Sequence, residues 1–292
     1  MNTHNHLPVT LRPGCKVNIF LDILQLRADG YHDLLTIFLP LPTPHDILTI
    51  MSGRPGTGLQ LQCSESLIPD SQNILFHCYR DFSDATGFAP DIEVHLDKNI
   101  PMGAGLGGGS SDAASFLLFL NNFAGNQGLE QSNLHHIASN LGADVPFFLT
   151  NQPAMATGRG DQLTPVQLPM QGLTMVLACP QISVSTAWAY KAWDDHQSRK
   201  STPPFPLTPT VLPDNIPALS NFVFHNSFER PVFMEYPQLR IVKELLLGLG
   251  ADGAALSGSG ASIFAVFREQ SAAANVLDQL RQMDVPTYQY TF

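Results

Sequence analysis

The stretch PMGAGLGGGSSDAAS, Pro101–Ser115, holds five glycines within the seven positions from Gly103 to Gly109. The segment before it, DIEVHLDKNI, alternates apolar and polar residues, which predicts a half-buried strand. The segment after it, SSDAASFLLFLNNFAG, is so apolar that it predicts a largely buried helix. A strand, a glycine-rich turn and a helix therefore follow one another directly in the middle of the chain.

The glycine stretch has four interpretations. Gly/Ser-rich segments often serve as flexible linkers, but here a strand and a buried helix flank the glycines directly. Gly103, Gly105 and Gly108 satisfy the G-x-G-x-x-G fingerprint of dinucleotide-binding proteins, yet the acidic residue expected about 20 residues later at a strand end is missing. A Walker A loop needs a lysine directly after its last glycine, where this chain has Ser110.

The fourth interpretation is an anion site that is formed by backbone groups. Glycines allow a loop to wrap around a phosphate chain with its N–H groups pointing inward. Ser110 or Ser111 can cap the helix and add a hydroxyl donor, and the helix N-terminus carries roughly half a positive charge. Such a loop can bind a triphosphate without a lysine of its own, so we favour this interpretation.

The composition limits the classes of function that the chain can have. Of its 292 residues, 44% are hydrophobic and 14% are charged, and the net charge is −10. An acidic surface is a poor partner for nucleic acid, so phosphate would have to be met locally. No apolar run approaches the roughly 18 residues of a membrane span, and the N-terminus lacks a signal-peptide pattern. These features predict a cytoplasmic protein without a nucleic-acid or membrane partner.

The cysteines and histidines do not indicate a metal site. The four cysteines are scattered and form no CxxC pair, which also argues against a disulfide framework. His135 and His136 are adjacent on a predicted helix, so they point to different faces and are poorly placed to chelate one ion. No metal ligand is therefore assigned from the sequence.

Lys16 and Asp144 are the candidates for chemistry beside a bound nucleotide. Lys16 lies within the apolar strand CKVNIFLDIL, where a charge without a partner would be costly to bury. Asp144 stands between the helix SNLHHIASNLG and a strand predicted at ADVPFFLT. The carboxylate could accept the proton of a hydroxyl while the ammonium stabilises the transferring phosphoryl group. The structural alternatives are a lysine whose head reaches the surface and an aspartate that caps a loop.

The order of the predicted elements favours an α+β fold with two lobes. Strands predominate before the glycine stretch. Beyond about residue 155, the helices STAWAYKAWDDH, YPQLRIVKELLLGLG and AAANVLDQLRQM alternate with the strands TMVLACP and SIFAVF. The Pro-rich segment SRKSTPPFPLTPTVLPD, residues 198–214, is expected to be a surface loop.

Several segments resemble those of the GHMP kinases, the galactose, homoserine, mevalonate and phosphomevalonate kinases. The glycine stretch is similar to their phosphate-binding motif, and LSGSGAS, residues 256–262, to their C-terminal glycine loop. KVNIFL, RADGYHDL, LGADVPFF, GRGDQLTP and SGSGASIFAVF follow in an order typical of one branch of the family. The resemblance implies a two-lobed α+β fold with domains at residues 1–155 and 156–292, the second packing helices on an antiparallel sheet.

The resemblance also implies a small-molecule kinase that uses ATP, with Mg²⁺ expected beside the nucleotide. The branch that RADGYHDL indicates phosphorylates an alcohol that carries a cytidine diphosphate, in isoprenoid biosynthesis by the non-mevalonate route. The alternatives are a homoserine or mevalonate kinase and a non-catalytic nucleotide-binding protein. RADGYHDL argues against the first alternative, and the presence of both Lys16 and Asp144 argues against the second.

Residue by residue, the resemblance makes Lys16 and Asp144 the catalytic pair. It assigns the substrate to Asn18, Tyr31, His32 and Thr186, with an aromatic ring on the cytosine; an ordinary polar turn is the alternative for Tyr31 and His32. The residues implied to bind ATP are Pro101, Met102, Gly103, Ala104, Gly105, Leu106, Gly107, Gly108, Gly109, Ser110 and Ser111, with Asn73, Lys98 and Met102 beside the adenosine. Phosphates and water would hold most of the Mg²⁺ shell, near Ser110, Ser111 or Asp112.

Overall fold

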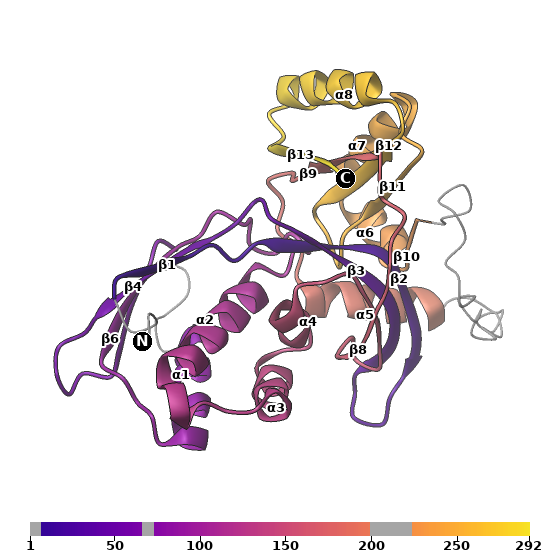
Figure 1. Cartoon of the computed structure of the whole chain (residues 1–292). Coiled ribbons are helices and arrows are strands. Elements are labelled where there is room, and N and C mark those ends of the chain that lie inside the picture. The colour runs from indigo at the N-terminus through magenta and orange to yellow at the C-terminus, as the bar shows by residue number, and fades with distance from the viewer. Residues whose placement is uncertain (1–6, 66–72, 199–223) are drawn as a thin grey trace. The chain divides into compact units, whose positions relative to one another are not determined.

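The computed structural model describes residues 7–65, 73–198 and 224–292 (Figure 1). Almost all of the Pro-rich segment lies outside these residues, so its place in a surface loop stays a prediction. Within the described ranges, no helix combines the length and the apolar character that crossing a membrane would require.

The chain forms two compact units, each assembled from separate segments. Unit 1 consists of the described residues of Met1–Lys16, Pro40–Ile100 and Gly107–Gln152, and unit 2 of those of Val17–Leu39, Pro101–Leu106 and Pro153–Phe292. The glycine stretch therefore passes from unit 2 to unit 1 between Leu106 and Gly107. The division into kinase domains at residues 1–155 and 156–292 stays a prediction.

Unit 1 contains a four-stranded sheet in the order β1-β4-β6-β5. Its strands are β1 (Val9–Leu11), β4 (Ile47–Ser52), β5 (Leu59–Cys63) and β6 (Ile92–Asp97). β4 is antiparallel to β1 and β6, whereas β5 is parallel to β6. β6 alternates as the sequence predicts, because Ile92, Val94 and Leu96 are buried between more exposed polar residues. Its carboxyl end leads directly into the glycine stretch.

The described residues of unit 1 also form four α-helices: α1 (Ile74–Thr86), α2 (Gly108–Ala124), α3 (Gln131–Leu141) and α4 (Val145–Thr150). α1 begins at Asn73, whose side chain accepts a hydrogen bond from the Leu75 N–H, and ends at Gly87 in the left-handed conformation. α2 contacts α1, α3 and α4 (Figure 1), which explains why its sequence is apolar on nearly every face. The helix that follows the glycines is thus a buried central element of its unit.

Unit 2 contains most of a five-stranded sheet in the order β10-β2-β3-β7-β8. Its strands are β2 (Cys15–Leu26), β3 (His32–Leu41), β7 (Ala154–Thr157), β8 (Gln162–Pro165) and β10 (His225–Asn226). The turn RADGY joins β2 to β3 and is closed by a 2.7 Å hydrogen bond from the Arg27 N–H to the Tyr31 carbonyl. A short connection joins β7 to β8, and this connection contains Arg159 and Asp161.

The second sheet of unit 2 is antiparallel throughout, in the order β11-β12-β9-β13. Its strands are β9 (Thr174–Ala178), β11 (Gly253–Leu256), β12 (Ile263–Phe267) and β13 (Thr287–Thr291). The helices in the part of unit 2 that the structure describes are α5 (Thr186–Ser198), α6 (Glu229–Glu235), α7 (Pro237–Gly248) and α8 (Gln270–Gln282). α7 contacts β11 and β12 of this sheet, and α8 contacts β9, β12 and β13. The buried residues of both helices recur three or four positions apart. The predicted α+β fold, with helices on an antiparallel sheet in the C-terminal part, is confirmed.

One predicted element is wrong. ADVPFFLT was expected to be a strand, but Val145–Thr150 form α4, with Asp144 at its N-cap position. A short apolar run gives no periodicity that separates a buried strand from a buried helix. Pro146 is the deciding residue, because proline is favoured in the first turn of a helix.

Candidate active site

Two glycines of the loop between β6 and α2 meet steric limits that exclude a side chain. Gly105 and Gly107 have φ angles of 74° and 71°, in the left-handed region that residues with a Cβ disfavour. A Cβ on Gly105 would also lie 1.9 Å from the Ser257 carbonyl oxygen. A Cβ on Gly107 would lie 3.0 Å from the Phe148 ring and 3.3 Å from Lys16 Cε. The loop can therefore follow this path only with glycine at these positions.

The carbonyl groups in the first half of the loop are bonded to the body of unit 2. The Gly103 carbonyl accepts from the Val184 N–H at 3.0 Å, and the Ala104 carbonyl accepts from the Ser262 N–H at 3.1 Å. The Gly105 carbonyl accepts from Ser257 Oγ at 2.9 Å. Because the N–H of a trans peptide points away from its carbonyl, these bonds turn the N–H groups of the same peptides to the other side of the loop. That side can donate to an anion.

The second half of the loop forms the start of α2. Gly107 occupies the N-cap position and makes no side-chain cap, so the predicted serine cap at Ser110 or Ser111 is wrong. Ser110 and Ser111 lie in the first turn instead, Ser110 partly exposed and Ser111 buried. The first N–H groups of an α-helix have no acceptor within the helix and carry its partial positive charge. The start of α2 thus presents N–H groups suited to phosphate.

Lys16 and Asp144 form an ion pair within unit 1. Lys16 Nζ lies 3.4 Å from Asp144 Oδ2, and the two side chains are 4% and 30% exposed. Lys16 comes from β2 and Asp144 from the N-cap position of α4, and Lys16 Cε lies beside Gly107 at the start of α2. A buried ammonium and an accessible carboxylate therefore meet at the positive end of a helix. Such a pair can hold a hydroxyl and balance charge on phosphate.

The three residues expected beside the adenosine lie in different settings. Asn73 is buried and uses Oδ1 to accept from the Leu75 N–H at 3.0 Å. Lys98 is bonded to two buried carboxylates, those of Asp46 and Asp112. Met102 is one of the few exposed large apolar side chains among the described residues, at 37%. The structure thus gives Asn73 and Lys98 bonds within the protein, and their contact with a nucleotide stays a prediction.

Asn18 and Thr186, both expected to contact the substrate, are bonded to the second glycine loop. The Asn18 N–H donates to Ser257 Oγ at 3.3 Å, and Asn18 Nδ2 donates to Thr36 Oγ1 at 2.8 Å. Thr186 Oγ1 lies 3.0 Å from Ser259 Oγ. The loop LSGSGAS therefore holds both residues in unit 2, as well as the carbonyl of Gly105.

His32 lies in an aromatic setting that the sequence did not reveal. Its Nε2 lies 2.9 Å from Asp194 Oδ1. Its ring stacks on Tyr190 with centroids 5.1 Å apart and meets the edge of Trp193 at 5.4 Å. The three partners come from α5, and their helical spacing is visible in STAWAYKAWDDH. Nothing in the sequence pairs them with a histidine 162 positions away from Asp194.

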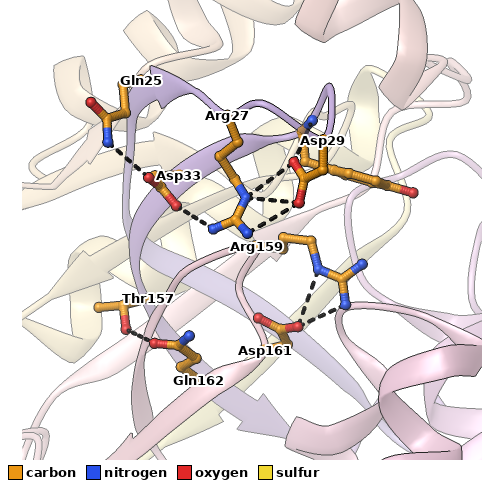
Figure 2. A network of polar contacts seen from close by, with 9 residues as sticks. Gln25, Arg27, Asp29, Asp33, Thr157, Arg159, Asp161 and Gln162 are labelled. Carbon is orange, nitrogen blue, oxygen red and sulfur yellow. Dashed lines mark hydrogen bonds and ion pairs between the residues drawn. The ribbon is translucent and has the colours of Figure 1, made fainter.

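Tyr31 is 57% exposed and ends the turn RADGY, which also carries Arg27 and Asp29. Its N–H donates to Asp29 Oδ1 at 3.1 Å, and the Arg159 guanidinium lies over its ring at 5.3 Å from the centroid. Arg27 bonds Asp29 and Asp33 (Figure 2), and these bonds hold the pKa of both carboxyl groups below the usual value. The network fixes the turn that carries Tyr31 and leaves its ring accessible.

The described residues contain no group of three or more His, Cys, Asp or Glu side chains that could hold a metal ion. Asp112 was expected near Mg²⁺, but its carboxylate is buried and bonded to Lys98. Ser110, partly exposed in the first turn of α2, is better placed to offer an oxygen near phosphate. The residues present therefore fit an ion whose ligands are mainly phosphate and water.

Known protein families match both parts of the chain. The GHMP kinases N terminal domain matches residues 73–152, and the GHMP kinases C terminal domain matches residues 215–285. The chain belongs to the GHMP kinase family. As a GHMP kinase it is a phosphotransferase that uses ATP and acts on a small molecule.

Relatives of this GHMP kinase span nearly its whole length. The 4-diphosphocytidyl-2-C-methyl-D-erythritol kinase of Nitratidesulfovibrio vulgaris (strain DP4) is 43% identical, covering 97% of this chain and 98% of the relative. The enzyme of the same name from Solidesulfovibrio magneticus is 44% identical, covering 93% of each chain. A crystal structure of 4-(cytidine 5'-diphospho)-2C-methyl-D-erythritol kinase matches with a TM-score of 0.74 and 31% identity, covering 96% of this chain and 98% of that one. Homoserine kinase from Cytophaga hutchinsonii shares the fold, with a TM-score of 0.69 and 18% identity over 95% of this chain and 93% of that one.

Proposed function

We propose that this GHMP kinase transfers the γ-phosphoryl group of ATP to the 2-hydroxyl of 4-diphosphocytidyl-2-C-methyl-D-erythritol, a step of isoprenoid precursor biosynthesis by the non-mevalonate route. The observation that carries the proposal is the likeness over nearly the whole chain to enzymes of that name, at 43% and 44% identity. The Lys16–Asp144 ion pair, which lies beside the N-cap of α2, supplies the groups that phosphoryl transfer needs.

Asp144 is the proposed proton acceptor. The hydroxyl oxygen of the substrate forms a bond to the γ-phosphorus while the hydroxyl proton passes to Asp144. The bond between the γ-phosphorus and the oxygen that bridges the β- and γ-phosphates breaks, and ADP leaves. An alcohol is about as weak an acid as water, whose pKa is about 15.7, so a carboxylate cannot deprotonate it before the reaction begins. In a loose transition state the proton can move late, so the position of the base matters more than its strength.

Lys16 is the proposed electrostatic partner. Its ammonium is buried, and the ion pair with Asp144 orients it toward the start of α2. A fixed cation in a water-poor site stabilises the charge that moves from the hydroxyl oxygen to the phosphoryl group. The loop Pro101–Ser111 would bind the phosphates of ATP through N–H groups. Mg²⁺, when bound, would neutralise phosphate charge, with the Ser110 hydroxyl as the nearest candidate ligand.

Asn18, Tyr31, His32 and Thr186 are the proposed substrate residues. The accessible ring of Tyr31 can stack on cytosine. A neutral His32 that donates from Nε2 to Asp194 keeps Nδ1 as an acceptor. The 4-amino group of cytosine is a donor that matches this nitrogen, and uracil has no such group. The aspartate thus favours a tautomer suited to a cytidine nucleotide.

A parallel assay tests the proposal. The purified chain is given ATP and Mg²⁺ with 4-diphosphocytidyl-2-C-methyl-D-erythritol, mevalonate or homoserine, and ADP release and phosphorylated product are measured. We expect turnover with the cytidylyl alcohol alone. Turnover only with mevalonate or homoserine would make the chain a different GHMP kinase. ATP binding without turnover on any of the three would contradict the substrate assignment.

A further inference from the structure

Three buried charged residues of unit 1 meet at one point. Lys98 Nζ donates to Asp112 Oδ2 at 2.7 Å and also to Asp46 Oδ2. The side chains of Lys98, Asp46 and Asp112 are 7%, 0% and 2% exposed. Asp46 lies directly before β4, Lys98 directly after β6, and Asp112 within α2. We call these three residues the buried trio.

The buried trio holds one ammonium against two carboxyl groups. Asp112 Oδ1 is buried and has no hydrogen-bond partner among the residues that the structure describes. Burial raises the pKa of Asp112 to about 7, although the Lys98 ammonium opposes the rise. A buried charge cluster of this kind is costly to assemble and sensitive to the loss of one member. The role of the trio follows from its bonds and contacts with the residues at the two ends of the glycine loop.

The trio bonds the residues that enter the loop. Asp46 Oδ1 accepts from the N–H groups of Asn99 and Ile100, at 2.5 and 2.8 Å. These two residues come directly before Pro101, where the loop begins. The single buried carboxylate of Asp46 thus fixes the backbone at the entry of the loop with one oxygen and binds Lys98 with the other.

The trio also lies against the residues that leave the loop. A Cβ on Gly108, the first residue of α2, would lie 3.4 Å from Asp46 Oδ2 and 3.0 Å from the Ile100 side chain. Lys98 reaches the same helix through Asp112. The two ends of the loop, Ile100 and Gly108, are therefore held close together by one set of buried charges.

We propose that the buried trio sets the separation of the two ends of the glycine loop, and that Lys98 acts as a positioning residue for phosphate binding and not by contact with the adenosine. The proposal rests on the proposed binding of ATP phosphates by this loop. A loop whose ends are fixed presents its N–H groups in one arrangement, so less conformational freedom is lost when phosphate binds. Loss of Lys98 frees the start of α2 from the entry strand.

Two substitutions and three ligands test the proposal. Lys98→Met removes the ammonium at similar length, and Asp46→Asn weakens the bonds to both Lys98 and the loop entry. Affinities for ATP, inorganic tripolyphosphate and adenosine are measured by calorimetry. We expect each variant to bind ATP and tripolyphosphate about tenfold more weakly, equivalent to about 1.4 kcal/mol, with adenosine affinity unchanged. In turnover, KM for ATP should rise while KM for the acceptor stays constant.

Contact between Lys98 and the adenosine predicts a different pattern. Lys98→Met would then weaken adenosine and ATP but not tripolyphosphate, and Asp46→Asn would have no effect on any of the three. That outcome overturns the proposal. If the wild type binds neither ATP nor tripolyphosphate, the proposed function of the loop fails together with the proposal. If the wild type and both variants bind equally well, only the role of the buried trio fails.

Amide hydrogen exchange separates a local effect from general unfolding. Asp91→Asn is a matched control, because Asp91 accepts from the N–H groups of Gly56 and Gly58 at 2.8 and 2.7 Å in the same unit. We expect faster exchange at residues 99–111 in Lys98→Met and Asp46→Asn, and wild-type exchange there in Asp91→Asn. Unchanged exchange at residues 99–111 in a folded Asp46→Asn protein would overturn the proposal even if Lys98→Met failed to fold.

Discussion

Lys16 Nζ and Asp144 Oδ2 lie 3.4 Å apart, and the aspartate side chain is 30% exposed whereas the lysine side chain is only 4% exposed. This difference in exposure gives the two side chains different roles. The lysine has its charge held in place by the surrounding strand and helices, and the aspartate keeps an accessible oxygen that a substrate hydroxyl can reach. An ordinary structural ion pair would need no such difference in exposure.

Asp144→Asn should abolish turnover and leave ATP affinity nearly unchanged. The amide keeps the size of the side chain but accepts a proton poorly, and general base catalysis contributes about 10²–10⁴-fold. Steady-state kinetics and ATP titration of the same preparation measure the two effects. Asp278→Asn is the matched control, because Asp278 forms an exposed ion pair with Arg281 on α8. Near-normal turnover of Asp144→Asn would remove Asp144 from the mechanism.

Gly107→Ala should weaken ATP binding. The φ angle of 71° disfavours any side chain, and the added Cβ would approach the Phe148 ring to 3.0 Å and Lys16 Cε to 3.3 Å. The loop or Lys16 must then move, so we expect a loss of turnover as well. Gly125→Ala is a matched control at the other end of α2, since its φ is 55° but nothing lies within 4 Å of the new Cβ. Equal ATP affinities for the two variants would argue against a close backbone path at Gly107.

Arg159→Met should raise KM for the cytidylyl substrate by a few-fold. The guanidinium lies over the exposed Tyr31 ring, and an exposed cation–π contact contributes about 0.5–1 kcal/mol. Without this contact the Tyr31 ring is held less firmly for stacking on cytosine. Lys16 and Asp144, the residues proposed for the chemistry, are unchanged. Initial rates at varied substrate should therefore show unchanged kcat and unchanged KM for ATP. Arg268→Met, which removes another exposed arginine paired with an aspartate, should leave all three constants as in the wild type.

The elements that the sequence predicts well are those with a local signal. β6 shows its alternation within six residues, and α2 and α3 show their apolar faces over eleven or more. The chemistry of Lys16 could likewise be anticipated, because a lysine inside an apolar strand needs a partner. ADVPFFLT failed because its six-residue helix is too short to show a period.

The contacts that the sequence did not predict join residues far apart in the chain. Asp46 and Lys98 are 52 positions apart, and His32 and Asp194 are 162 positions apart. Each is an ordinary polar residue in its own segment, and only the tertiary fold brings the two together. Lys98 illustrates the consequence: the resemblance implies that it lies beside the adenosine, but only the structure reveals that its ammonium pairs with Asp46 and Asp112.

Asp112→Asn should make the stability of the protein depend less on pH. Burial raises the pKa of Asp112 to about 7, whereas an unfolded aspartate has a pKa of about 3.9. Between these values the folded protein holds a proton that the unfolded chain has lost, so this group's contribution to stability falls as the pH rises from about 4 to about 7 and is constant above. The charges that face Asp112 are Lys98 and Asp46, which lie at the ends of β6 and β4.

Urea unfolding at several pH values measures this contribution. The free energy of unfolding of the wild type, minus that of Asp112→Asn, should decrease by on the order of a few kcal/mol between pH 4 and pH 7. Carboxylates such as Asp91, whose pKa is lowered by bonds from the N–H groups of Gly56 and Gly58, give the opposite slope but cancel in the difference. A difference that stays constant over this range would mean that Asp112 is ionised throughout. The buried trio would then carry a full excess negative charge beside the start of α2, where it would oppose the binding of phosphate.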